Sequence, residues 1–334
     1  MKKNITRWFQ DAWYAEMYIS SIFMPISMIY DDIIRFRSFL YRIGLFKKHK
    51  LSVPVVIVGN ITVGGTGKTP LILSLARLLR EEGYKPGIIS RGYGGNSETW
   101  PVWVDDQTKA ELVGDEAVLM VKRADCPIVV GPERYKAAQM LLDKSDCDII
   151  LSDDGLQHYA LARDIEIAVI DGKRRFGNGY LLPCGPLRES ISRLQTVDLV
   201  IVNGTAEECE ENEFQMEIEG NIAINLKTRE EKMLTDFSGA SVHALAGIGS
   251  PKRFFNLLES HNISIDAHSF PDHHQFTSDD IVFDGDKSVL MTEKDAVKCF
   301  DFASEKHWYV PIKAVPEVHF VDKLLTLIKE KIRG

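Results

Sequence analysis

A glycine-rich segment at residues 59–69 has the residue types needed to hold the phosphates of a nucleotide. It reads Gly-Asn-Ile-Thr-Val-Gly-Gly-Thr-Gly-Lys-Thr, with a strand-like apolar run before it and a helical pattern after it. Glycines let backbone N–H groups turn toward phosphate oxygens, the lysine reaches the β and γ phosphates, and the last threonine is a ligand for Mg²⁺. The predicted nucleotide contacts are Thr62, Val63, Gly64, Gly65, Thr66, Gly67, Lys68 and Thr69.

The spacing in this segment favours a phosphate loop over a purely structural turn. At average composition, Gly-Gly-x-Gly-Lys-Ser/Thr arises by chance in about one chain in a thousand of this length. Thr62 stands where such loops usually begin with a glycine, so we expect a variant of the common loop. A glycine-rich turn without a ligand is the alternative.

Two carboxylates, Asp153 and Asp154, end the apolar run at residues 148–152. A carboxylate at the end of a strand beside a phosphate loop is where P-loop enzymes hold Mg²⁺. Successive residues in a strand point to opposite sides, so one carboxylate is expected at the metal and the other beside a neighbouring group. The pattern leaves open which of them contacts the ion, and a simple Asp-Gly turn is the alternative.

Three further segments carry polar residues next to predicted strands or helices. Asp115 and Glu116 stand at the start of an apolar helical pattern, where acids usually serve the helix dipole. Arg91 and Tyr93 lie in a glycine-rich loop that could hold an anionic or sugar substrate, although a solvated turn fits equally well. Arg188 lies in a proline-rich loop and could stabilise charge on a transferred phosphoryl group, or form an ordinary surface ion pair.

Alternating strand-like and helical patterns must position these residues. The alternation predicts an α/β fold with a P-loop NTPase-like, mostly parallel sheet and helices on both faces. In such sheets, ligands bind at the carboxyl ends of the strands, where the polar segments fall. The strand-like runs are residues 53–58, 87–90, 128–131, 148–152, 165–170 and 199–202.

The pattern divides the chain into four parts. Residues 1–50 form a basic, amphipathic arm and residues 51–212 the P-loop core, followed by linker strands at 213–234 and a smaller α/β domain at 235–334 that closes over the active site. His273 and His274 stand at an element end of the smaller domain, with no cysteine or third histidine at zinc-ligand spacing. An acid-base or orienting role is therefore the better functional interpretation of this pair.

Composition excludes several classes of protein. The 334 residues are 45% hydrophobic and 26% charged, an ordinary globular balance. The net charge of −8 is uneven, because the arm carries +5 and the remainder −13, so we expect no nucleic-acid partner. The five cysteines are scattered, which indicates reduced thiols and neither a zinc site nor a disulfide framework.

The arm has the pattern of a helix that lies on a membrane surface. The fourteen uncharged residues between Glu16 and Asp31 are fewer than the roughly 20 needed to span a bilayer. Residues 33–50 contain six basic residues and no acid, which suits an anionic lipid interface, while a helix docked on the protein's own core is the alternative. The apolar face is formed by Ile19, Ile22, Ile26, Ile29, Ile33, Phe36, Leu40 and Ile43.

Taken in order, these motifs resemble the lipid A 4'-kinase (tetraacyldisaccharide 4'-kinase) family over nearly the whole chain. The resemblance implies ATP- and Mg²⁺-dependent phosphorylation of the 4'-hydroxyl of an acylated glucosamine disaccharide 1-phosphate, giving lipid IVA. It also implies a peripheral or monotopic location on the cytoplasmic face of the bacterial inner membrane, and we infer no protein partner. The motifs are residues 62–70, 90–94, 114–116, 153–158, 181–189, 271–274 and 292–295.

The resemblance also implies roles for individual residues. Asp115 paired with His273 would activate the hydroxyl, and the position after Asp272 favours His273 over His274. The two partners fall in different predicted domains, so they can meet only across the cleft between them. Further implied contacts are Lys68 and Thr69 for phosphate and Mg²⁺, Asp153 and Asp154 for the metal, Arg188 and Glu189 for the nucleotide, and Arg91, Tyr93 and Glu116 for the substrate.

Two other classes of protein remain open. A P-loop GTPase would need a guanine-reading motif, and a metallochaperone would need a metal-binding cluster. The segment with Lys294 and Asp295 does not fit the guanine motif, because that motif has one residue between its lysine and its aspartate. A soluble small-molecule kinase would share the core but would leave the basic arm without a purpose. Flotation with liposomes separates the second class from a lipid kinase.

Overall fold

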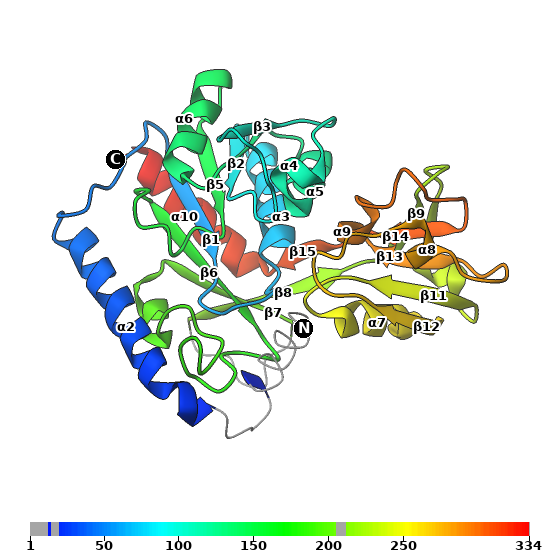
Figure 1. Ribbon diagram of the computed structural model, residues 1–334. Helices are drawn as coiled ribbons and strands as arrows, with labels where there is room; N and C mark the ends of the chain where they lie inside the picture. The colour runs from blue at the N-terminus through cyan, green and yellow to red at the C-terminus, as the bar shows by residue number, and fades with distance from the viewer. Residues whose placement is uncertain (1–12, 15–19, 205–211, 334) are drawn as a thin grey trace.

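The computed structural model describes residues 13–14, 20–204 and 212–333, which form a larger and a smaller α/β unit (Figure 1). In these residues, the larger sheet has the order β15-β8-β7-β6-β1-β5-β2-β4-β3. Its pairs are parallel except at the edges, where β3 and β15 run antiparallel to their neighbours. The strands are β1 (Val55–Gly59), β2 (Pro86–Ser90), β3 (Val102–Val104), β4 (Ile128–Val130), β5 (Ile149–Asp153), β6 (Ile165–Asp171), β7 (Leu199–Asn203), β8 (Glu213–Glu219) and β15 (Lys313–Pro316).

Helices cover both faces of the larger sheet, as predicted. β1 is buried along its length, and alternate residues of a strand point to opposite faces. Val56 and Val58 pack with α3 (Lys68–Glu81), α5 (Asp115–Ala124) and α10 (Val318–Arg333), whereas Val55 and Ile57 pack with α6 (Arg134–Lys144). The short helix α4 (Ala110–Val113) leads into α5, and η1 (Ile191–Thr196) precedes β7.

The smaller unit is built on a second sheet with the order β10-β9-β14-β13-β11-β12 in the described part of the chain. The four strands β12, β11, β13 and β14 are parallel, and apolar clusters cover both faces. Its elements are β9 (Ile222–Asn225), β10 (Glu231–Met233), η2 (Leu234–Phe237), β11 (Ser241–Ala246), α7 (Pro251–Ser260), β12 (Ser264–Ser269), α8 (Ser278–Ile281), β13 (Val289–Thr292), α9 (Glu293–Ala296) and β14 (His307–Val310).

The end of the chain differs from the predicted division into domains. Residues 235–334 were expected in the smaller unit, but β15 pairs with β8 and α10 packs on the larger core (Figure 1). The cause is apolar packing, because Phe320, Leu324 and Ile328 are buried there and Phe320 contacts Phe214 edge to face. The predicted linker strands also separate, since β8 belongs to the larger sheet and β9 and β10 to the smaller one.

Helix α2 (Ser20–Arg42) lies along the outside of the larger unit, on the side away from the smaller unit (Figure 1). Its Ser27 hydroxyl donates to the Leu181 carbonyl at 2.8 Å, and its Arg37 guanidinium donates to the Gln157 carbonyl at 2.6 Å. No helix in the described ranges is long and apolar enough to cross a membrane. Members of the predicted apolar face are exposed to solvent, namely Ile26, Ile29, Ile33, Phe36 and Ile43, while Leu40 is half-buried and Ile19 and the Ile22 side chain lie outside the described parts.

Candidate active site

The predicted phosphate loop connects β1 to α3 and has the backbone that its glycines permit. Gly64 and Gly67 have φ values of 107° and 98°, a region that residues with a Cβ rarely adopt. A Cβ on Gly67 would lie 2.5 Å from Nδ2 of Asn203, which donates to the Thr66 carbonyl at 2.9 Å. Helix α3 begins at Lys68, so its positive end faces the loop as a phosphate site requires.

The proline-rich loop at residues 181–189 is fastened to the phosphate loop. The Val63 N–H donates to the Pro186 carbonyl at 2.8 Å, and the Arg188 N–H donates to the Ile61 carbonyl at 2.7 Å. These backbone bonds hold the Arg188 side chain beside the nucleotide loop. Its guanidinium donates to both Asp154 oxygens, at 2.9 and 3.1 Å.

Asp153 and Asp154 point to different partners, as their adjacent positions predicted. Asp153 ends β5 and is buried, and its Oδ2 accepts a hydrogen bond from the Ser90 hydroxyl at 3.1 Å. Asp154 has a positive φ of 48°, which turns it toward Lys68, whose Nζ lies 3.5 Å from Oδ1. The pair therefore separates into a buried carboxylate and one held by two cations.

Their surroundings also push the pKa values of the two carboxyls apart. Burial, together with the negative charges of Glu116 and Asp154, raises the pKa of Asp153 to about 7. Burial acts in the same direction on Asp154, but Lys68 and Arg188 outweigh it and lower its pKa to about 2. Asp154 is thus ionised throughout the neutral pH range, whereas burial brings the pKa of Asp153 into that range.

The residues at the end of β5 fit a hard divalent cation. Oδ1 of Asp153 is buried and has no hydrogen-bond partner among the described residues. Thr69, at the second position of α3, supplies a hydroxyl beside the phosphate loop. Carboxylate and hydroxyl oxygens are the donors that Mg²⁺ prefers, so Asp153 and Thr69 are the better candidates and Asp154 is already engaged by its two cations.

Asp115 and His273 come together from the two units. Asp115 begins α5 and is buried, and its Oδ2 lies 3.3 Å from Nδ1 of His273. His274 turns away, because its Nε2 lies 3.2 Å from Asp280 and its ring packs against Phe270. Of the two adjacent histidines, only His273 faces the aspartate.

Two lysines that no predicted role included complete this contact between the units. Lys298 Nζ lies 3.4 Å from Oδ2 of Asp115 and 3.3 Å from Oδ1 of Asp295. Burial alone would raise the pKa of Asp115, but the hydrogen bond with His273 and the charge of Lys298 hold that pKa below its ordinary value. Lys294 lies 3.1 Å from Glu116 and, at the same distance, from Asp272. The Thr-Glu-Lys-Asp segment pointed to Lys294, whereas nothing local distinguishes Lys298 from a surface lysine.

The smaller unit also approaches the phosphate loop itself. A Cβ on Gly249, which precedes α7, would lie 3.7 Å from the Gly65 nitrogen. On α7, Arg253 donates to Asp171 of the larger unit at 2.8 Å. These contacts place the start of α7 beside the phosphate loop.

The loop after β2 lies against the Asp115–His273 pair. The exposed ring of Tyr93 has its centroid 5.3 Å from that of His273. Gly114 makes this fit possible, because a Cβ there would lie 2.1 Å from the Tyr93 carbonyl oxygen. Arg91 is exposed on the same loop, so the predicted substrate residues Arg91, Tyr93 and Glu116 border one region.

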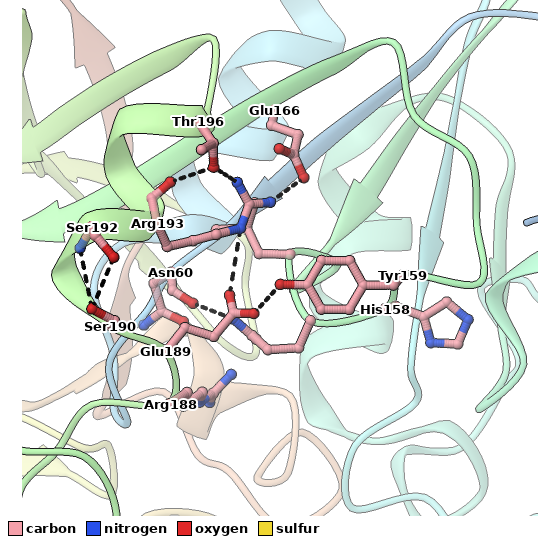
Figure 2. A network of polar contacts seen from close by, with 12 residues as sticks. Asn60, His158, Tyr159, Glu166, Arg188, Glu189, Ser190, Ser192, Arg193 and Thr196 are labelled. Atoms are coloured by element: carbon pink, nitrogen blue, oxygen red, sulfur yellow. Dashed lines mark hydrogen bonds and ion pairs between the residues drawn. The ribbon is translucent and has the colours of Figure 1, made fainter. Parts of the chain in front are cut away.

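Glu189, a predicted nucleotide contact, has partners within the chain. Its side chain is buried, and one carboxylate oxygen accepts a hydrogen bond from the Tyr159 hydroxyl (Figure 2). The other carboxylate oxygen accepts from Gln157 Nε2 at 3.0 Å. Gln157 Nε2 also lies 3.0 Å from the Asn60 carbonyl at the start of the phosphate loop. Through these contacts, Glu189 fastens the loop that carries Arg188 to the start of the phosphate loop.

Comparisons with known proteins give one consistent family. The family model described as tetraacyldisaccharide-1-P 4'-kinase matches residues 19–329. The chain is 48% identical over 318 residues to the tetraacyldisaccharide 4'-kinase of Nitrosococcus oceani, covering 95% of this chain and 93% of that protein. It is 48% identical over 330 residues to the enzyme of the same name from Methylobacillus flagellatus, covering 97% of each. The crystal structure of LpxK from Aquifex aeolicus in complex with ATP superposes with a TM-score of 0.79 at 30% identity, covering 93% of this chain and 99% of that one.

Proposed function

The chain belongs to the tetraacyldisaccharide-1-P 4'-kinase family, and from this premise we propose that it transfers the γ-phosphoryl group of ATP to the 4'-hydroxyl of a tetraacylated glucosamine disaccharide 1-phosphate. The product is lipid IVA, the bisphosphorylated lipid. The observation that best supports this reaction is the 3.3 Å contact between Asp115 and His273, which joins a base to an orienting group across the two units. A GTPase or a metallochaperone has no need of such a pair.

The residues suggest a division of labour in the transfer. The hydroxyl oxygen attacks the γ phosphorus while the bond to the bridging oxygen breaks, and ADP leaves with the electron pair of that bond. Asp115 accepts the hydroxyl proton and His273 orients the carboxylate or shares its proton, because a sugar hydroxyl is a weak nucleophile without a base. Lys298 keeps Asp115 ionised between turnovers.

Cations of the larger unit serve the phosphates. Lys68 and Arg188 flank Asp154 and would neutralise the charge that spreads over the γ-phosphoryl oxygens during transfer. Asp153 and Thr69 would hold Mg²⁺, which when bound polarises the phosphate oxygens and shields their charge. Arg91, Tyr93 and Glu116 border the acceptor side and would contact the sugar or its phosphate.

The test of this function is direct. The protein is incubated with ATP, Mg²⁺ and acylated disaccharide 1-phosphate in detergent micelles, and the lipids are resolved by mass spectrometry. We expect a product one phosphate heavier, with the new phosphate at the 4' position, and no product when ATP is omitted. Turnover of soluble sugars with an unreacted lipid would contradict the proposal and favour a soluble kinase.

We further propose that α2 docks on the cytoplasmic surface of the inner membrane. Its apolar residues are exposed, with Ile29 at 60% and Ile33 at 59%, although most large apolar side chains of a folded protein are buried. Basic residues follow on the same arm and add roughly 1 kcal/mol each near an anionic surface. The Tyr30 hydroxyl of α2 donates to the Arg188 carbonyl at 3.3 Å, so a docked helix would bring the active-site loop to the lipid.

Flotation with anionic vesicles tests the docking. The double substitution Ile29→Glu/Ile33→Glu should abolish flotation and raise the KM for micellar lipid, with the fold unchanged because both side chains are exposed. Val282→Glu/Val318→Glu is the matched control, since these valines are exposed at 65% and 71% on other surfaces. Equal flotation of both variants would show that α2 does not contact the membrane.

A further inference from the structure

We propose that the smaller unit carries a second metal site, for a transition-metal ion of the Zn²⁺ class, formed by His243, Asp266 and His268. This site is separate from the Asp153 region and does not depend on the proposed kinase reaction. It lies on the edge strand β12 and its neighbour β11.

The register of the two strands brings the three side chains to one place. His243 on β11 is paired with Asp266 on β12, so these side chains stand opposite each other on one face of the sheet. His268 is two residues after Asp266 and therefore points to the same face. A regular, parallel pair of strands thus holds all three groups without a strained loop.

The distances suit a tetrahedral ion. Nδ1 of His243 lies 3.1 Å from Nε2 of His268 and 3.3 Å from Oδ2 of Asp266, and one donor atom from each residue fits within a 4.8 Å cluster. A Zn²⁺ ion bound at about 2.0–2.1 Å in a tetrahedron separates its ligands by about 3.3 Å. Two of the three separations are close to this value, and Nε2 of His268 lies 3.9 Å from Oδ1 of Asp266, whose exposed side chain can turn to complete the set.

The surroundings of the three side chains favour a metal site whose fourth coordination position is open to water. Phe283 stacks on both imidazoles, with ring centroids 4.3 Å from His243 and 4.2 Å from His268, which fixes the planes of the rings. His243 is buried, whereas the Asp266 side chain is 57% exposed, so water can reach the fourth position.

The donor set selects the class of ion. Two imidazoles and one carboxylate suit Zn²⁺, Co²⁺ or Ni²⁺, while Mg²⁺ and Ca²⁺ prefer sites made of oxygen alone. The ion would join edge strand β12 to β11. Because the chain runs from β12 into the segment that carries His273, the metal would also stiffen the start of that segment.

The rival explanation is a hydrogen-bonded pair of histidines with no affinity for metal. To separate the two, the full-length, chelator-treated protein is titrated with Co²⁺ in the presence of ATP and excess Mg²⁺, which occupy the nucleotide site. We expect one Co²⁺ per chain with visible absorption typical of tetrahedral coordination, displaced by Zn²⁺, and a higher Tm when the metal is bound.

Three single variants decide the outcome. His243→Gln, His268→Gln and Asp266→Asn should each weaken binding by at least about 100-fold, because loss of a group that only orients a ligand already costs about 10- to 100-fold. The Asp266 side chain is exposed, so Asp266→Asn should fold normally even if the histidine variants do not. His319→Gln, on the exposed surface of α10, is the control. Binding that survives all three substitutions, or that never saturates, would overturn the site.

Discussion

Replacing Lys298 with methionine tests whether this lysine of the smaller unit keeps the Asp115 carboxylate of the larger unit ionised. The Lys298 side chain is 4% exposed, bridges Asp115 and Asp295, and stacks over Phe276 at 5.0 Å. Methionine keeps most of its length and apolar contact but removes the charge. The other side chains that act on Asp115 from the packed elements are His273, through its hydrogen bond, and, more weakly, the charge of Lys294.

The distance between Lys298 Nζ and Asp115 Oδ2 sets the size of the stability loss expected in Lys298→Met. Two unit charges 3.4 Å apart attract by about 5 kcal/mol at an effective dielectric constant of about 20, before the cost of burying them is subtracted. Removing one member of a buried pair typically costs about 3–5 kcal/mol of folding stability. Lys298→Met should therefore unfold at a clearly lower temperature, and kinetics should be measured well below its Tm.

The pH dependence identifies the role. Lys298 helps to hold the pKa of Asp115 below its ordinary value, so its removal raises that pKa. The base acts only when ionised, and activity falls as pH drops through its pKa. The acid limb of the profile of kcat against pH should thus move to higher pH in Lys298→Met, with kcat approaching that of the parent protein at alkaline pH.

Two controls complete the measurement. Lys298→Arg keeps the charge and should restore the acid limb, while Lys306→Met removes a lysine that pairs with the exposed Asp286 and should change nothing. A lower kcat with an unmoved acid limb would mean that Lys298 only supports the fold. The same result in the arginine variant as in the methionine variant would refute the electrostatic reasoning.

Two further substitutions address the loops around the site. Lys68→Ala should abolish lipid phosphorylation in a protein with an unchanged circular dichroism spectrum, because the lysine neutralises phosphate charge that shifts during transfer, and near-normal turnover would refute the phosphate-loop assignment. Gly114→Ala should lower the free energy of unfolding by more than the roughly 1–3 kcal/mol typical of a left-handed residue, since its Cβ would also lie 2.1 Å from the Tyr93 carbonyl oxygen. Gly285→Ala is the control in thermal unfolding, because Gly285 has a φ of 88° but open space around an added Cβ. Equal losses of stability in the two variants would show that contact with the Tyr93 carbonyl adds nothing at Gly114.

Local chemistry explains what could be predicted from the sequence. The phosphate loop and the Asp153–Asp154 pair lie within single strand-to-turn segments, where glycine and carboxylate spacing determines the geometry. The apolar face of α2 was also visible, because a helical period depends on neighbours three and four residues apart. The meeting of Asp115 with His273, by contrast, followed only from the family resemblance.

Contacts between distant segments explain what could not be predicted. Lys298 meets Asp115 from a separate unit, and no local pattern records such a partner. Helix α10 shows an apolar face, yet periodicity does not say which of two sheets will cover it. Glu189 stands beside Arg188 but faces Gln157 and Tyr159, which depends on the packing of the whole loop.

The central claim is that Asp115 of the larger unit and His273 of the smaller unit act together as one proton-transfer pair. A double-mutant cycle in kcat tests it most directly. Asp115→Asn and His273→Ala should each lower kcat by about 10²- to 10⁴-fold with ATP affinity nearly unchanged. The double variant should lose far less kcat than the product of the two single losses, because the effects of residues that act together are not additive in free energy. Fully multiplicative losses would contradict the claim and show that the two side chains act independently.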